Sequence, residues 1–413
     1  MILLQESYCD AFVHESYDKP ETVPQPYIDS AGLANLLKAL PPKVVCDALL
    51  QAFVIGVRPV LPLVHMPTFQ TDYNNFWQWA RNSDIALPDP KLFSDPTFLC
   101  LLFSILYCGA KTATASMWAT SALHGMKKET IIDKMMLASS TSLRLCKHSQ
   151  YPTISTLVAL LLAHGCSGQG GEPVEDLGFI STAVRIAQIM GLHRDGALFG
   201  FDTRTCEMRR RVWWYIVSID VSTSRLHGTQ TCCGPIYGSR RDVRMVSKIR
   251  DEDLSERGAD LLSPLPTPPS GTISVAMLLL IGRFEAAKFE HYLINYLHNA
   301  HALGQPQFNE LTCAARKVMV QIESLISIIP VQGFPEKGFI PARLANASPT
   351  THEGLYGDHT SQPTVLSSWA RIMLTMIKSE IAILVHHPFL GRADSIDKQQ
   401  QKRWNRYVDL HLG

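Results

Sequence analysis

The sequence predicts an all-α protein: one large multi-helix domain with proline-rich linkers and no significant sheet. Three observations carry this prediction. Apolar residues recur at three- and four-residue spacing through most of the chain, which is typical of helices that bury one face. No stretch alternates apolar and polar residues in the way that a half-buried strand does. Glycine and proline stand between the periodic stretches, where helices begin and end.

Length and composition indicate a folded chain with no strong attraction to nucleic acid. The 413 residues are 46% hydrophobic and 18% charged, and the formal net charge is +1. A chain of this length can bury a sizeable core, in one domain or in two closely packed ones. A net charge near zero gives no strong field for DNA. No segment has the long apolar run of a membrane span, and Met1–Ser7 lacks the features of a secretory signal, so no membrane association is expected.

The cysteines indicate neither a zinc site nor a disulfide framework. The ten cysteines are scattered, and no Cys-x-x-Cys pair occurs, so a zinc ribbon or finger is not encoded. Most of them lie inside apolar helical patterns, where a free cysteine behaves as a small buried hydrophobe. We therefore expect no metal site and no cofactor in this chain, and a reducing intracellular environment.

The chain is expected to begin with a loosely ordered lead-in over residues 1–42, which contains one short helix near 30–40. The helical domain then covers residues 43–413. Its first helix begins at Lys43 and ends before Pro59, because the residue that precedes a proline is disfavoured in the α region.

The next predicted helix is a buried one. Ser94-Asp95-Pro96 combines a capping side chain with a proline at the start of a helix. Residues 97–110 are apolar nearly all round, which favours a helix in the interior. Further helices are expected over 129–147 and 153–164, and a glycine-rich loop over 165–171.

The second half of the chain is predicted to hold two helix pairs and two linkers. One pair covers 172–190, ending at Gly191, and 205–226, ending at Gly228, because glycine accepts the left-handed conformation at a helix end. The remaining elements are a linker over 261–271, two long helices over 273–302 and 308–329 that form an antiparallel pair, a second linker over 330–363, and a helix over 364–386 that Pro388 closes.

The first of these pairs carries the most informative pattern. The turn after its first helix reads Gly191-Leu192-His193-Arg194-Asp195, and its second helix contains Arg209-Arg210-Arg211 followed by Trp213-Trp214. Asp220, Ser224 and Gly228 come later in the same helix and at its end. This arrangement resembles the central signature of the fungal-specific transcription factor domain, which is the middle homology region of the fungal zinc-cluster regulators.

The resemblance extends over roughly residues 43–390. An early element, Pro59-x-x-Pro62-x-x-His65-x-x-x-Phe69, and a late element around His386-His387-Pro388 are similar to the family's pattern. Three departures stand beside them, and they concern local loops rather than the fold. Gln230 replaces a proline, His387 replaces an arginine, and a basic stretch from Cys232 through Arg250 occupies the place of an acidic segment.

The resemblance implies a nuclear transcription regulator of metabolic genes, with specialised-metabolite clusters as one option. It implies that the chain acts through its regulatory domain, because the family's zinc cluster is not in this sequence. Expected partners are another DNA-binding regulator or a second copy of this chain, with DNA reached only indirectly and a small-molecule effector as a further ligand. Zinc is expected only if an N-terminal zinc cluster exists outside this sequence.

Other interpretations of single motifs are weaker. Arg209-Arg210-Arg211 with Trp213-Trp214 invites a nucleic-acid reading, but successive helical residues point in different directions, and Glu207 lies one turn from Arg211. His193-Arg194-Asp195 matches a kinase catalytic triplet without the other kinase motifs, so we expect it to cap and anchor the turn.

Three further motifs have a possible chemical interpretation. They are Gly165-Cys166-Ser167-Gly168 as a nucleophile turn, His386-His387 as metal ligands, and Cys232-Cys233 as a redox pair. None has the partners that its chemistry needs. We therefore expect no catalytic residues, and keep two alternatives to a regulator: an enzyme built on the same helical scaffold, and an inactive truncated regulator.

Overall fold

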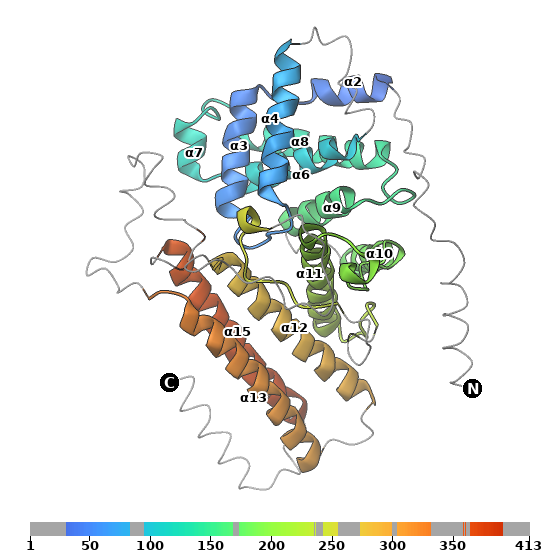
Figure 1. Cartoon of the computed structure of the whole chain (residues 1–413), viewed down its shortest axis with the longest axis vertical. Coiled ribbons are helices and arrows are strands. Elements are labelled where there is room, and N and C mark those ends of the chain that lie inside the picture. The colour runs from blue at the N-terminus through green and yellow to red at the C-terminus, as the bar shows by residue number, and fades with distance from the viewer. Residues whose placement is uncertain are drawn as a thin grey trace.

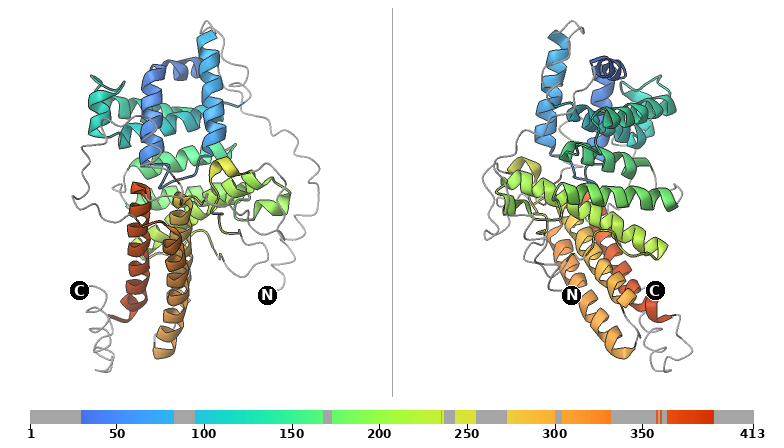
Figure 2. Two further views of the ribbon diagram at one scale, coloured as in Figure 1. Left: turned by 60° about the vertical axis from the view of Figure 1, so that its left-hand side comes forward. Right: turned by 90° about the vertical axis from the view of Figure 1, so that its right-hand side faces the viewer.

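The fold is entirely helical in the part of the chain that the structure describes (Figures 1 and 2). The computed structural model describes residues 30–82, 95–167, 173–234, 236, 243–254, 273–299, 304–331, 358, 360 and 364–390. Within these residues there are twelve α-helices, two short 3-10 helices and no strand, so the all-α prediction is confirmed. The predicted lead-in up to residue 29, the linker over 261–271 and most of the linker over 330–363 lie outside the described residues.

The elements, in chain order, are α2 (Ser30–Lys38), α3 (Lys43–Gly56), α4 (Met66–Asn82), α6 (Thr97–Thr112), α7 (Ala115–Thr120), α8 (Lys128–Leu145), α9 (Ile154–Ser167), α10 (Pro173–Ile189), η1 (Gly196–Phe199), α11 (Thr203–His227), η2 (Asp251–Asp253), α12 (Val275–Asn299), α13 (Gln305–Ile328) and α15 (Val365–Leu390). The predicted helices are present in the predicted order, and α4, α7 and the two 3-10 helices are elements that the sequence did not predict.

Helix α6 is the centre of the N-terminal group of helices, and α3, α8 and α9 pack around it. Its residues from Leu99 to Ala110 are buried apart from Leu101, which is half-buried, as the apolar sequence predicts. Gly109 lets α3 approach closely: a Cβ atom at this position would lie 2.0 Å from the Leu49 carbonyl oxygen. The N-cap residue of α6 is Pro96 rather than a capping side chain, and Asp95 stands one residue earlier, where its Oδ1 accepts a hydrogen bond of 3.1 Å from the Thr97 amide.

Three long helices form the C-terminal group, in which α12, α13 and α15 pack against one another (Figure 1). The short connection between α12 and α13 makes them the antiparallel pair that the sequence predicts. Helix α11 packs against α12 and against α10, and it therefore lies between the two groups.

Two predicted helix ends are wrong. Helix α9 continues through Gly165 and Cys166 to Ser167, so these residues are helical rather than a loop. A glycine inside a helix costs only about 1 kcal/mol relative to alanine, and packing of the helix overrides that preference. Helix α15 continues past Pro388 to Leu390. The φ angle of proline suits a helix, and its ring removes only one backbone hydrogen bond, which a last turn tolerates.

No single helix among the described residues is long and apolar enough to cross a membrane. Helices α2 and α3 are long and apolar enough only when they are taken together, and a bend of 78° separates them. The apolar side chains of α3, such as Val45, Leu49 and Phe53, are buried in the core.

Candidate functional site

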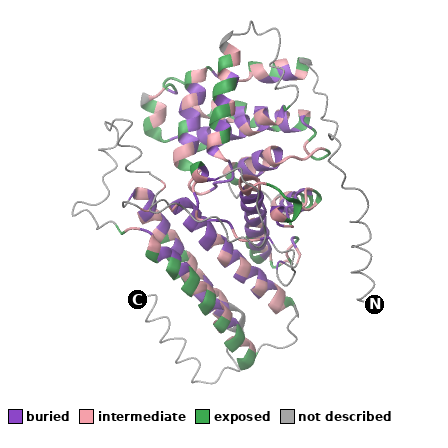
Figure 3. Ribbon diagram, in the orientation of Figure 1, coloured by how far each residue is buried: buried purple, intermediate pink, exposed green. Residues whose placement is uncertain are grey.

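Helix α11 contains most of the residues that the sequence singles out, and it is defined at both ends. Its 25 residues begin after Asp202, whose Oδ1 accepts a hydrogen bond of 3.0 Å from the Thr205 amide. It ends at Gly228, whose φ of 66° is the left-handed conformation that glycine adopts at low cost. Fifteen of its 25 residues are buried, most of them between Cys206 and Val221 (Figure 3).

The turn that follows α10 is held by α11. Gly191 has a φ of 66°, and the Leu192 amide donates a hydrogen bond of 2.8 Å to the Ala187 carbonyl, which ends α10. Nη2 of Arg209 donates to the carbonyls of Met190 and Gly191, at 3.2 and 2.9 Å. The carbonyls of the turn that follows α10 are therefore held by an arginine of the next helix, and the Arg194 amide of the triplet also donates to the Gly191 carbonyl at 3.2 Å.

Asp195 and Arg210 form a buried ion pair that anchors the same turn, as the sequence predicts for the triplet. Nε and Nη2 of Arg210 donate to the two carboxylate oxygens of Asp195, at 2.8 and 2.7 Å. The carboxylate also accepts hydrogen bonds of 3.0 Å from the amides of Ala197 and Arg244. Burial by itself would raise the pKa of Asp195, but these hydrogen bonds and the charge of Arg210 hold it below its usual value.

Arg211 lies at the centre of a second, fully buried cluster. Its Nη1 donates to Asp251 Oδ1 at 2.6 Å and to the Pro62 carbonyl at 3.3 Å, and its Nε donates to Glu207 at 3.3 Å. Glu207 also accepts two hydrogen bonds of 3.1 Å from the Ser247 amide. The Arg211 and Glu207 side chains have no exposed surface, so the pairing of these two residues is confirmed as a structural contact.

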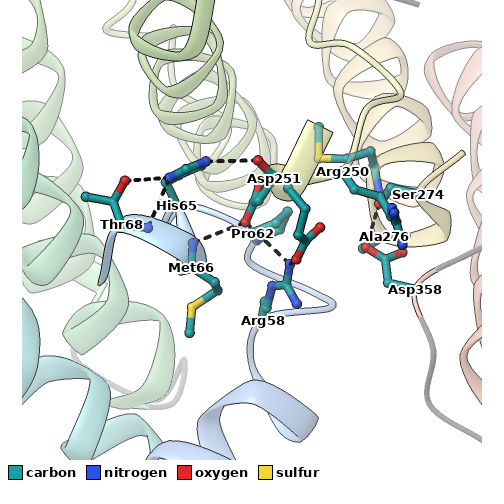
Figure 4. Close-up of polar contacts among 12 residues, drawn as sticks. Arg58, Pro62, His65, Met66, Thr68, Arg250, Asp251, Ser274, Ala276 and Asp358 are labelled. Carbon is teal, nitrogen blue, oxygen red and sulfur yellow. Dashed lines mark hydrogen bonds and ion pairs between the residues drawn. The ribbon is translucent and has the colours of Figure 1, made fainter. Parts of the chain in front are cut away.

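Asp251 connects this cluster to the chain segment that precedes α4 (Figure 4). Its carboxylate accepts hydrogen bonds from Arg58 and from the Met66 amide, at 3.4 and 3.3 Å, and its carbonyl lies 3.0 Å from His65 Nε2. Burial would raise the pKa of Asp251, whereas the charges of Arg211 and Arg58 hold it below its usual value. Residues up to 193 positions apart in the sequence thus meet at one carboxylate.

The C-terminal half of α11 organises the turn beyond it. Both oxygens of the Asp220 carboxylate accept backbone hydrogen bonds, from Cys232 at 3.0 Å and from Cys233 at 2.8 Å. Ser224 Oγ donates to the Gln230 carbonyl at 3.2 Å. This is the segment that departs from the family pattern, and its backbone is nevertheless held by two side chains of the pattern.

The two tryptophans are part of the core. Trp213 and Trp214 are each 4% exposed. Nε1 of Trp214 donates a hydrogen bond of 3.0 Å to the Arg244 carbonyl, and its ring stacks on Phe284 of α12. Trp213 packs beside His193, with ring centroids 6.2 Å apart. The structural interpretation of these aromatic residues therefore agrees with their positions.

The chemistry of this site is that of a buried junction between segments. All three arginines of the run are buried, and each donates hydrogen bonds to the protein, so they are not presented to a nucleic acid. Asp195, the position of the base in the kinase triplet, has no exposed surface and is paired with Arg210. Within the described residues, no group of three histidine, cysteine or acidic side chains is arranged to hold a metal ion.

Among the weaker motifs, Cys232-Cys233 lies at the end of α11, where Asp220 accepts hydrogen bonds from both backbone amides. His386 packs against the ring of Phe308, and the side chain of His387 lies outside the described part. Cys232 is exposed and lies 3.4 Å from Ser181 Oγ, whereas Cys233 is buried, and burial raises the pKa of its thiol.

The sequence did not predict which residues from other segments form hydrogen bonds and ion pairs with the side chains of α11. Arg58, Arg244, Ser247 and Asp251 do not belong to any motif of the sequence, and their roles follow from the way the chain folds back on α11. One signal was present: Asp251-Glu252-Asp253 is an acidic run directly after a basic stretch. Such a run beside three consecutive arginines is a candidate for ion pairing.

Comparison with known proteins gives this arrangement a context. A model of the fungal specific transcription factor domain matches residues 50–298, which is more than half of the chain and includes all of α11. Transcription factor macR of Penicillium terrestre is 45% identical over 406 residues, covering 98% of this chain and 47% of that protein. Transcription factor yanR of Aspergillus niger is 43% identical over 351 residues, covering 84% of this chain and 42% of that protein.

A more distant match is the pyriculol/pyriculariol biosynthesis cluster transcription factor 1 of Pyricularia oryzae. It is 30% identical over 206 residues, covering 49% of this chain and 25% of that protein. The chain spans about half the length of the curated relatives macR and yanR. No solved structure matches it significantly.

Proposed function

Because this chain belongs to the fungal specific transcription factor domain family, we propose that it is the regulatory region of a fungal transcription regulator. The observation that carries the proposal is the 45% identity with a transcription factor over 98% of the chain. The regulated genes are metabolic, and those of specialised-metabolite clusters are the first candidates. The Pyricularia oryzae relative is named as a biosynthesis cluster transcription factor, which supports this choice.

The proposed mode of action is through protein contacts in the nucleus. The three arginines of α11 are engaged inside the protein, so DNA would be reached only indirectly. A zinc cluster, where one takes part, would come from sequence outside these 413 residues or from a partner. The proposed partners are another DNA-binding regulator or a second copy of this chain, with a small-molecule effector as a further ligand that shifts the packing of the helices.

A catalytic role is not part of the proposal. The acidic groups of the α11 junction hold arginines and backbone amides rather than facing an open site, which supports a non-enzymatic role. An enzyme needs a nucleophile or an acid–base pair within reach of a substrate.

The test is a change of transcription in the fungus that carries the gene. Disruption of the gene is expected to change the transcript levels of neighbouring metabolic genes, and the wild-type gene should restore them. The Arg211→Ala variant should fail to restore them, because it opens the α11 junction, whereas Lys317→Ala on the exposed side of α13 should succeed. A fluorescent fusion should accumulate in the nucleus. Unchanged transcripts after disruption would overturn the proposal.

A further inference from the structure

Three exposed apolar side chains lie at the 3-10 turn between α10 and α11, over the half-buried Arg194 and the buried Arg209. Leu198, Phe199 and Phe201 are 37%, 43% and 37% exposed, although large apolar side chains are usually covered. The Arg194 guanidinium lies over the Phe199 ring at 5.0 Å, and that of Arg209 lies over the Phe201 ring at 5.0 Å. We call these five residues the arginine–aromatic patch.

The patch carries positive charge that nearby carboxylates do not neutralise. Asp195 is committed to Arg210, and Asp202 caps α11. Arg194 forms no ion pair within the described part of the chain, and its Nε is buried without a hydrogen-bond partner there. Arg209 donates only to backbone carbonyls.

The positive charge of the patch also affects the pKa of a neighbouring histidine. The pKa of His193 lies below its usual value, first because the ring is partly buried and then because Arg194 and Arg209 repel its charged form. Aromatic side chains and arginine are the residue types enriched where proteins bind one another, and here the Asp195–Arg210 ion pair anchors the turn that carries them. The surface therefore suits an acidic chain that also carries aromatic or aliphatic side chains.

The N-terminal segment of this protein has that chemistry. Residues 1–29 contain six carboxylates and one lysine, a net charge of −5, in a protein whose total formal charge is +1. The same residues contain the aromatic side chains Tyr8, Phe12, Tyr17 and Tyr27. Acidic segments with interspersed hydrophobic residues commonly fold only when they bind a partner surface.

The segment is also long enough to reach the patch. It joins the described structure at the start of α2, and Figure 1 shows α2 above α10 on the right-hand side of the molecule. A stretch of 29 residues spans up to about 95 Å when it is fully extended. Helix α15, one of the longest in the protein with 26 residues, is roughly 39 Å long at 1.5 Å per residue.

We propose that the acidic, aromatic segment 1–29 docks on the arginine–aromatic patch of the same chain. Its carboxylates pair with the charge of Arg194, in the positive field of the buried Arg209, and its aromatic rings pack on Leu198, Phe199 and Phe201. This proposal does not depend on transcription regulation, since it concerns only how one part of the chain binds another.

The test is hydrogen exchange of the full-length chain, measured by mass spectrometry. Residues 1–29 should exchange several-fold more slowly in the protein than in a synthetic peptide of the same sequence, and this protection should weaken in high salt. The double variant Arg194→Glu, Phe199→Ser should speed their exchange about tenfold, since a cation–π pair and an aromatic anchor are lost together.

The matched control makes a charge reversal and an apolar-to-serine change of the same kind elsewhere. Lys317→Glu, Val320→Ser alters an exposed lysine and an exposed apolar residue of α13, and should leave exchange of residues 1–29 as in the wild type. Equal thermal unfolding of the two variants would show that both are folded. Exchange of residues 1–29 at the free-peptide rate in the wild type would overturn the proposal, and so would protection that survives the patch variant. Protection that rises with protein concentration would assign the docking to a second copy instead.

Discussion

Helices α6 and α11 are both buried centres of the protein, and they reach that state in different ways. Around α6 the contacts are almost wholly apolar, and its residues from Leu99 to Ala110 bury surface against three neighbouring helices. Helix α11 is buried to a similar extent, yet it encloses Glu207, Asp220 and three arginines. Apolar side chains can be buried against any apolar surface, whereas each buried charged side chain needs a specific partner.

The two kinds of burial have different energetic consequences. Apolar contacts are non-directional, so a core such as that of α6 tolerates changes that keep its volume. A buried ion pair contributes little net stability compared with apolar residues of the same size, but removal of one partner strands the other charge. The α11 junction should therefore specify which segments meet, and should respond severely to the loss of one member.

The largest expected effect is that of Arg211→Ala. This change leaves the carboxylates of Glu207 and Asp251 buried without their common cation. We expect a loss of about 3–5 kcal/mol in the free energy of unfolding, the range measured when one partner of a buried ion pair is removed. The measurement is the urea unfolding curve followed by circular dichroism, with the wild-type slope as a check that the transition remains comparable.

Two further variants decide whether charge is the reason. Arg211→Ala combined with Asp251→Asn should recover part of the loss, because one of the stranded charges is gone. Arg316→Ala on the exposed surface of α13 should change stability by less than about 0.5 kcal/mol. Equal losses for Arg211→Ala alone and in the combined variant would mean that α11 is held by packing, as α6 is.

Acidification should weaken the α11 junction while leaving the α6 contacts unaffected. The pKa values of Asp195 and Asp251 are both held below the ordinary value of 3.8. Their contribution to stability is fully present above that value and is lost as the pH falls through the lower folded pKa values. Urea unfolding from about pH 5 to about pH 2.5 should show this decline, and the slope should be smaller in Asp251→Asn. A variant with the wild-type pH dependence would contradict the role given to Asp251.

The same contrast explains how much could be predicted from the sequence. Helix α6 was predicted, together with its burial, because its apolar residues follow one another without a gap, and that is a local property. The start and end of α11 were predicted with similar success from Gly228 and from the pattern inside the helix. The prediction of a loop from Gly165 onward was wrong for residues 165–167, because packing kept them helical.

The partners of α11 could not be predicted in the same way. The pair of Glu207 with Arg211 is one helical turn long and was found from the spacing. The contacts of Arg211 with Asp251 and of Arg210 with Asp195 join positions whose distance in the sequence carries no information about contact. Such pairs depend on the path of the turns, and no local propensity encodes that path.

A smaller loss of stability is expected at Gly109, where α6 and α3 approach most closely. Gly109→Ala would place a Cβ atom 2.0 Å from the Leu49 carbonyl oxygen, so α3 and α6 must move apart. Overpacking of this kind costs about 1–3 kcal/mol. Gly178→Ala is the matched control, since it is an exposed helical position of α10 with no atom within 4 Å of the added group. It should leave stability unchanged or raise it by up to about 1 kcal/mol. Thermal unfolding compares the two, and equal behaviour would show that the α3–α6 contact can relax.

The smallest effect concerns the end of α11. Gly228 has a φ of 66° and no atom within 4 Å of an added Cβ, so Gly228→Ala introduces backbone strain and nothing else. We expect a loss of about 1 kcal/mol in the free energy of unfolding, and a smaller one for Gly228→Asn, because asparagine tolerates the left-handed region better. Because Asp220 and Ser224 hold the backbone at residues 230–233 independently of this glycine, the turn should keep its conformation. A loss of several kcal/mol would instead mean that the glycine positions the turn, and that the polar contacts of α11 only follow it.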